Sequence, residues 1–175
     1  MLKVLRKKIG KTVAVVAVAA GVGVFAPAVA EAGTVSVTWG CGSIGGPSGT
    51  KTFEITVTAP ATATVGQTVT VQADLKQVAP AWGSTEPAGK YTGSIVLALG
   101  GAASGRADAT GMTNPAIQPG TPFRMTGGTG QVTLPTAGQV TLATSSYILY
   151  YSTGTFIMSC GGSGAKPVAA TIQVS

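Results

Sequence analysis

Apolar and polar residues alternate along most of the chain after residue 34, with the period of two that is typical of β-strands with one buried face. The alternating or continuously apolar segments are 35–39, 53–57, 69–75, 95–99, 132–134, 140–142, 147–151, 156–160 and 168–174. Segment 95–99 is apolar throughout, as in a central strand that is buried on both faces. No segment of ten or more residues after residue 33 has a convincing helical period. The pattern predicts an all-β domain of about 8–9 short strands joined by turns, which indicates a β-sandwich.

The first thirty residues follow a different pattern. They begin with five cations: Lys3, Arg6, Lys7, Lys8 and Lys11. An apolar stretch of Val, Ala and Gly follows and ends before Pro27, and Ala30 and Ala32 each complete a small-x-small cleavage pattern. This order predicts a cleavable signal peptide over residues 1–30, with cleavage after Ala30 or Ala32. An uncleaved membrane anchor is the alternative, but a membrane span needs about twenty consecutive apolar residues. Residues 33–175 are then expected to form a single domain.

The signal peptide accounts for most of the net charge. The whole chain has 11 Lys and Arg against 5 Asp and Glu, a formal charge of +6. Without the five N-terminal cations, six cations face five acids, which leaves +1, or +2 if cleavage removes Glu31. We therefore expect neither a nucleic-acid-binding stripe nor a polybasic membrane patch. The expected location is secreted, extracellular or loosely associated with the cell envelope, with no stable membrane anchor after cleavage.

The two cysteines, Cys41 and Cys160, lie near opposite ends of the predicted domain. In an exported protein an even number of cysteines favours a disulfide. This disulfide would close a loop of roughly 120 residues and contribute about 4–5 kcal/mol in the chain-entropy account. The alternative is a metal site with two thiolates, but the chain has no His to complete it.

Segment 59–71 reads APATATVGQTVTV, with Pro60 where an edge strand would tolerate it and Gly66 at a predicted turn. This segment resembles the opening of bacterial immunoglobulin-like (Ig-like) domains. The chain after the signal resembles secreted actinobacterial Ig-like domains of unknown function, which have an early Cys, the same Pro/Gly opening and a Val- and Thr-rich body. The resemblance implies an Ig-like β-sandwich and, at most, a surface or binding role. The spacing of Cys41 and Cys160 is wider than that of the inter-sheet pair in antibody domains.

Groups that could catalyse a reaction are scarce. Without His the chain has no Ser-His-Asp or Cys-His arrangement and no imidazole metal ligand. The five carboxylates are widely separated in sequence, and nothing pairs two of them as the acids of a glycosidase. We expect no enzymatic activity, no metal and no cofactor.

Two long connections carry the candidate binding residues. The candidates are Trp82, Glu86 and Lys90 in the first connection (76–91) and Arg106 and Asp108 in the second (100–121). Trp82 lies among Pro, Ala and Gly and is interpreted either as a contact anchor or as a lid on the open end of the sandwich.

The sequence also contains a cluster of three tyrosines: Tyr147, Tyr150 and Tyr151. They suggest either a carbohydrate-stacking surface or ordinary packing, since alternation places Tyr150 on the opposite face from the other two. Trp39 is expected to pack on the disulfide. We therefore expect a monomeric, secreted, Ig-like structural or interaction module whose partner is a protein or a cell-envelope glycan. The alternative is a β-sandwich that binds a small ligand or carbohydrate through exposed aromatic residues.

Overall fold

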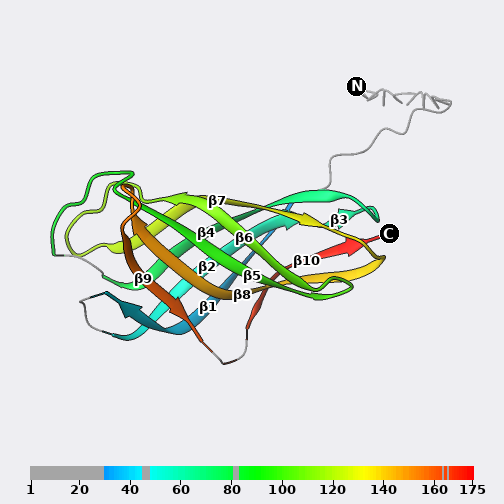
Figure 1. Ribbon diagram of the computed structural model, residues 1–175, viewed down its shortest axis with the longest axis horizontal. Coiled ribbons are helices and arrows are strands. Elements are labelled where there is room, and N and C mark those ends of the chain that lie inside the picture. Colours follow the sequence, from blue (N-terminus) through cyan, green and yellow to red (C-terminus); the bar gives the residue numbers. More distant parts are fainter. Residues whose placement is uncertain (1–29, 45–47, 81–82, 163, 165) are drawn as a thin grey trace, which may run out of the picture.

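The computed structural model describes residues 30–175 apart from 45–47, 81–82, 163 and 165, and this part of the chain contains ten strands and no helix (Figure 1). The all-β class predicted from the sequence is confirmed. The strands are β1 (Ala30–Ser43), β2 (Gly49–Pro60), β3 (Thr62–Ala63), β4 (Thr68–Pro80), β5 (Tyr91–Gly101), β6 (Gly105–Thr113), β7 (Pro122–Thr133), β8 (Gly138–Tyr151), β9 (Phe156–Gly161) and β10 (Val168–Val174). The predicted signal peptide lies outside the described residues, except that Ala30 and Ala32 belong to β1.

All ten strands belong to one sheet, in the order β3-β10-β8-β5-β6-β7-β4-β2-β1-β9. Neighbouring strands are antiparallel except β3 and β10. The last strand in this order, β9, also pairs with β8, so the sheet closes on itself. Through this closure β9 has a partner on each side, β1 and the second part of β8, and does not leave an open strand edge.

The disulfide between Cys41 and Cys160 is confirmed, and it lies at this closure. The two cysteines are direct partners in the β1–β9 ladder, with their Cα atoms 4.1 Å apart, and they are separated by 119 positions in the sequence. The bond therefore joins the first strand covalently to the ninth.

Strand β8 has two different partners on one side. Its first part, up to Ala143, pairs with β10, and its second part, from Ser146 to Tyr150, pairs with β9. Between the two parts the register with β5 shifts by one residue. Residues three positions apart in a regular strand face opposite sides, but this shift leaves Thr144 and Tyr147 both fully buried. The sequence predicted separate strands at 140–142 and 147–151, and the structure joins them through this bulge.

The long connection predicted over residues 100–121 is wrong over much of its length, because β6 occupies Gly105–Thr113 and pairs with β5. Its buried positions include Ala107 and Ala109, whose small side chains gave only a weak alternating pattern. On the neighbouring strand β7, Gly130 lies beside Ala109. A Cβ atom on Gly130 would lie 2.8 Å from the carbonyl oxygen of Asp108, so β7 can approach β6 closely only without a side chain there.

Three aromatic side chains connect the interior across the closed sheet. The ring centroids of Trp39 on β1 and Phe53 on β2 are 5.8 Å apart, and those of Phe53 and Tyr147 on β8 are 6.0 Å apart. Phe53 and Tyr147 are fully buried, and Trp39 is 5% exposed. Trp39 thus packs inside the core two residues from the disulfide.

The hydroxyl of Tyr147 has no hydrogen-bond partner among the described residues. Burial raises the pKa of this hydroxyl well above its ordinary value, because ionisation would place an unsolvated charge in the core. The ring of Tyr147 therefore stabilises the core by packing. Its hydroxyl destabilises the core, because it loses its hydrogen bonds to water on folding and gains none in the protein.

Replacing Tyr147 by Phe is expected to raise the free energy of unfolding by about 1–2 kcal/mol, since the ring is kept and the unpaired hydroxyl is removed. Urea denaturation measures the change. The matched control is Tyr151→Phe, whose hydroxyl belongs to an exposed residue and whose loss should change stability by less than about 0.5 kcal/mol. A loss of stability in Tyr147→Phe would contradict the prediction and indicate that the hydroxyl has a partner such as a buried water.

Candidate functional site

Two candidate features that are far apart in the sequence meet at one end of the sheet, which we call the loop end (left in Figure 1). Tyr91, the first residue of β5, is the register partner of Tyr151, the last residue of β8. Their ring centroids are 5.6 Å apart. The backbone N–H of Ser152 donates to the carbonyl of Lys90 over 2.9 Å. The structure thus brings Glu86 and Lys90, from the first candidate connection, beside the end of the tyrosine-containing strand.

A buried asparagine holds the connection before β5 in place. Asn114 is 2% exposed, and its side-chain oxygen accepts a hydrogen bond from the N–H of Tyr91 over 2.8 Å. Its amide nitrogen donates to the carbonyls of Pro87 and Pro115, over 2.8 and 2.9 Å. The sequence interpretation did not assign Asn114 a role. Its signal is weak, because an Asn before a Pro most often marks a turn.

Glu86 is fixed by backbone pairing and by charge. Its N–H and carbonyl both bond to Ile117 over 2.9 Å, so the two connections at the loop end are bridged. The ammonium of Lys90 donates to one carboxylate oxygen of Glu86, and the hydroxyl of Ser84 donates to the other over 3.2 Å. The hydrogen bond from Lys90 lowers the pKa of Glu86, and the same bond raises the pKa of Lys90. Both groups are therefore charged at neutral pH.

The ion pair lies beside buried aromatic rings. The Lys90 nitrogen is 5.5 Å from the centroid of the Tyr91 ring, within the range of a cation–π contact. Tyr91 in turn packs edge-on against Phe123, with centroids 5.9 Å apart. Burial is the main cause that raises the pKa of the Tyr91 hydroxyl. These contacts give the loop end a fixed floor of aromatic rings beneath a charged pair.

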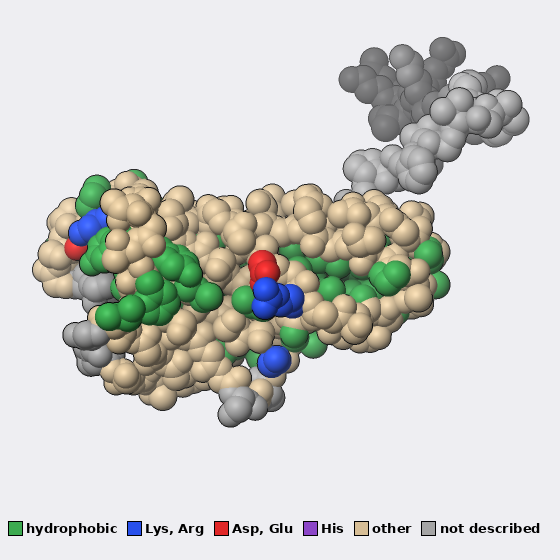
Figure 2. Space-filling model, viewed as in Figure 1, with side chains coloured by type: hydrophobic (Ala, Val, Ile, Leu, Met, Phe, Trp, Pro, Cys, Tyr) green, Lys and Arg blue, Asp and Glu red, His purple; other side chains and the backbone are tan. Residues whose placement is uncertain are grey.

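Three further aromatic side chains lie where β8 ends and β9 begins, and we call them the aromatic rim: Tyr150, Tyr151 and Phe156. Of these, Tyr151 packs on Tyr91, while Tyr150 and Phe156 pack together on the opposite face of the sheet. Tyr151 is 41% exposed, while Tyr150 and Phe156 are half-buried with their ring centroids 5.8 Å apart. Figure 2 shows hydrophobic side chains gathered toward this end, on the face where β8 and β9 lie. Tyr147 is buried in the core, so the three tyrosines do not form one continuous stacking surface. The rim consists instead of the ends of β8 and β9.

The remaining candidate residues do not join this site. Trp82 lies outside the described residues. Arg106 and Asp108 lie on β6, where they form an exposed ion pair of 3.4 Å. Their partners on β5 are Ala98 and Val96, well along the strand from Tyr91. Only Glu86 and Lys90 of the predicted binding residues therefore lie at the loop end as the structure describes it.

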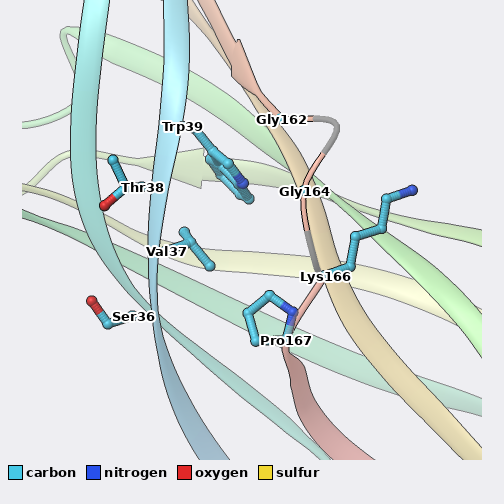
Figure 3. Close-up of a pocket in the computed structure, with 8 residues that line it drawn as sticks. All are labelled: Ser36, Val37, Thr38, Trp39, Gly162, Gly164, Lys166 and Pro167. Carbon is cyan, nitrogen blue, oxygen red and sulfur yellow. The ribbon is translucent and has the colours of Figure 1, made fainter.

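A separate cleft of about 300 Å³ lies between β1 and the segment that leads from β9 to β10. Figure 3 shows Val37 and Trp39 pointing into it toward Pro167, while Ser36 and Thr38 point the other way and Lys166 extends outward. Trp39 and Val37 are buried core residues, so the floor of the cleft is the hydrophobic core itself. We interpret this cleft as a packing feature: core side chains of β1 border the segment that leads to β10, and the cleft is not a ligand site.

Two further features bear on the kinds of site that the chain could hold. The described residues contain no group of three or more Cys, Asp or Glu side chains arranged to hold a metal ion. Within the same part of the chain, no helix has the length and apolar character needed to cross a membrane.

Comparisons of the chain with protein-family models, curated proteins and solved structures find no match.

Proposed function

We propose that this protein is an exported Ig-like interaction module that binds a protein partner at or outside the cell envelope, without catalysis, through the aromatic rim. The observation that carries the proposal is the exposure of Tyr151 at the end of β8, next in sequence to Tyr150, which packs against Phe156 on the other face of the same strand end. Tyrosine supplies a large contact area at low conformational cost, and it is enriched among the residues that dominate binding at protein interfaces.

The rigidity of the rim supports this role. Tyr150 and Phe156 are partners in the β8–β9 ladder, and Tyr151 is paired with Tyr91 across the β5–β8 ladder. Side chains on hydrogen-bonded strands lose less freedom on binding than side chains on free loops, so more of the contact energy remains as affinity. The adjacent Glu86–Lys90 pair supplies charged groups at the margin of the apolar surface, where they favour correct orientation of a partner.

Export and the Ig-like relationship are supported by local features. A disulfide is typical of proteins that mature in an oxidising compartment. Gly66 has a φ of 82° in the turn before β4, which supports the resemblance to Ig-like openings. Pro60 departs from it, because it ends β2, a strand that lies between β1 and β4 and not at an edge of the sheet. If the signal is cleaved at the first predicted site, the mature chain begins at Glu31 and keeps nearly all of β1.

Replacing Tyr151 by Ala is expected to weaken partner binding at least about tenfold, because an exposed interface tyrosine commonly contributes more than 1.4 kcal/mol. The partner is first identified by placing a photo-reactive residue at position 151 in the exporting cell, and its affinity is then measured with both purified proteins. The matched control is Val65→Ala, an exposed apolar residue (50%) in the turn before β4, outside the loop end.

Equal affinity of the wild type and Tyr151→Ala would overturn the proposed site, provided that circular dichroism shows both to be folded. Equal losses in Tyr151→Ala and Val65→Ala would also overturn it, because the effect would not be local. If the exported protein instead binds oligosaccharides on a glycan array and Tyr151→Ala abolishes the signal, the module is a carbohydrate-binding domain that uses the same rim.

A further inference from the structure

A polar groove of about 370 Å³ crosses the outer face of β1, β2, β4 and β7. In the closed order of strands, β4 lies opposite β8, so this groove and the aromatic rim face different directions. Its lining includes the side chains of Glu54, Asp74, Lys76 and Arg124, and three threonines, Thr34, Thr56 and Thr126, complete its polar surface. Charged residues make up only 9% of the chain, yet two acids and two bases converge in this groove.

Three of the four charges already have partners within the protein. The ammonium of Lys76 forms an ion pair of 2.7 Å with Glu54 on the adjacent strand. The carboxylate of Asp74 accepts a hydrogen bond of 2.8 Å from the backbone N–H of Gly127. These contacts hold both carboxylates in place, and each carboxylate can still accept further hydrogen bonds from a ligand.

Arg124 is the exception. It is exposed, and its guanidinium forms no hydrogen bond or ion pair with any residue that the structure describes. It is also the direct register partner of Lys76 in the β4–β7 ladder, so two cations face each other on neighbouring strands. Glu54 already offsets the charge of Lys76, so Arg124 is the cation that an anion can contact without breaking an existing ion pair. The planar guanidinium fork matches a carboxylate, which it can bind with two parallel hydrogen bonds.

The balance of charge limits the kind of anion that fits. Glu54 and Asp74 line the same groove, so a dianion such as a phosphate monoester would meet two negative groups as well as Arg124. A ligand with one carboxylate and several hydroxyls avoids this conflict, because its hydroxyls donate to Glu54 and Asp74 while its carboxylate binds Arg124. The threonine hydroxyls can donate or accept and therefore suit the same ligand. Among them, Thr34 and Thr56 already share a bond of 2.8 Å.

We infer that this groove is a binding site for a sugar acid, a saccharide unit that carries a single carboxylate, with Arg124 as the residue that recognises the carboxylate. The site is independent of the protein-binding role proposed for the aromatic rim.

The test uses three hexoses that differ only at the sixth carbon: glucuronate, glucose and glucose 6-phosphate. Each is titrated into the purified, disulfide-bonded protein, and backbone and arginine side-chain resonances are followed by NMR. We expect glucuronate to shift the resonances of Arg124 and Thr126 and to bind at least about tenfold more tightly than glucose, because charge-assisted hydrogen bonds are lost with the neutral sugar. Glucose 6-phosphate is expected to bind more weakly than glucuronate.

Two variants assign the effect to the guanidinium. Arg124→Gln is expected to reduce the affinity for glucuronate to that of glucose, and Arg124→Lys to restore it only in part, since an ammonium lacks the fork. The control is Arg106→Gln, which removes an exposed arginine outside the groove that has its own partner, Asp108, and should leave binding unchanged. Thermal melting confirms that each variant is folded.

Equal binding of glucose and glucuronate would overturn the inference, as would an absence of shifts at Arg124 with all three sugars. Tighter binding of glucose 6-phosphate would overturn the assigned ligand class. Equal losses in Arg124→Gln and Arg106→Gln would show that the protein attracts anions without a specific site. All of these results leave the aromatic rim unaffected, because the rim lies on another part of the sheet.

Discussion

Replacing Cys41 and Cys160 together by Ala is expected to lower the free energy of unfolding by about 4–5 kcal/mol. The disulfide closes 119 positions of sequence, so its loss returns a large amount of conformational freedom to the unfolded chain. The bond also joins β1 to β9, the strand through which the sheet closes on β8. In the variant, the short β1–β9 ladder must hold that closure by its hydrogen bonds alone.

Guanidinium denaturation of the oxidised wild type, the reduced wild type and the double variant measures this effect. The reduced wild type and the double variant should agree with each other. Ser43→Ala, a change in the same ladder that leaves the disulfide intact, is the control and should alter stability by less than about 0.5 kcal/mol. A loss below about 1 kcal/mol in the double variant would show that the link does little to restrict the unfolded chain.

Replacing Phe53 by Ala is expected to cost about 3–5 kcal/mol, the usual range when a large aromatic side chain is removed from a packed core. Phe53 is fully buried and stands between Trp39 and Tyr147, so it links β1, β2 and β8 across the interior. The cavity left by its removal would separate the two other rings. We expect the near-ultraviolet circular dichroism signal of Trp39 to decrease as its packing loosens.

Denaturant unfolding at neutral pH measures the loss, with Thr50→Ala as the control. Thr50 is exposed on the same strand, and its substitution should change stability by less than about 0.5 kcal/mol. If Phe53→Ala were as stable as Thr50→Ala, the interior would have to refill the cavity, and Phe53 would not be a central packing residue.

The fold class could be predicted from alternation because most strands bury large side chains on one face. Alternation did not reveal β6, because Ala and Gly replace the large apolar residues that make the pattern visible. It also divided β8 into two strands, because a bulge interrupts the period of two. The closure through β9 could not be predicted, since periodicity gives the faces of a strand but not its neighbours.

The candidate sites were predictable to a similar extent. Glu86 and Lys90 could be identified as charged residues in a connection, but their position beside Tyr151 depends on the pairing of β5 with β8. The sugar-acid groove gave no signal in the sequence. Its four charged residues lie on three strands, one on β2, two on β4 and one on β7, and only the register between these strands brings them together.

The pairing of β1 with β9 also constrains the order in which this protein can fold. A chain that leaves a ribosome or a translocation channel with its N-terminus first presents β1 long before residue 156 emerges, so one side of β1 stays without its partner throughout that interval. Non-local pairings of this kind make folding slow. Slow folding often allows incorrect disulfides to accumulate, but this chain has two cysteines and can form only one intramolecular disulfide. The delay therefore exposes an unpaired strand edge without creating a choice between disulfide isomers.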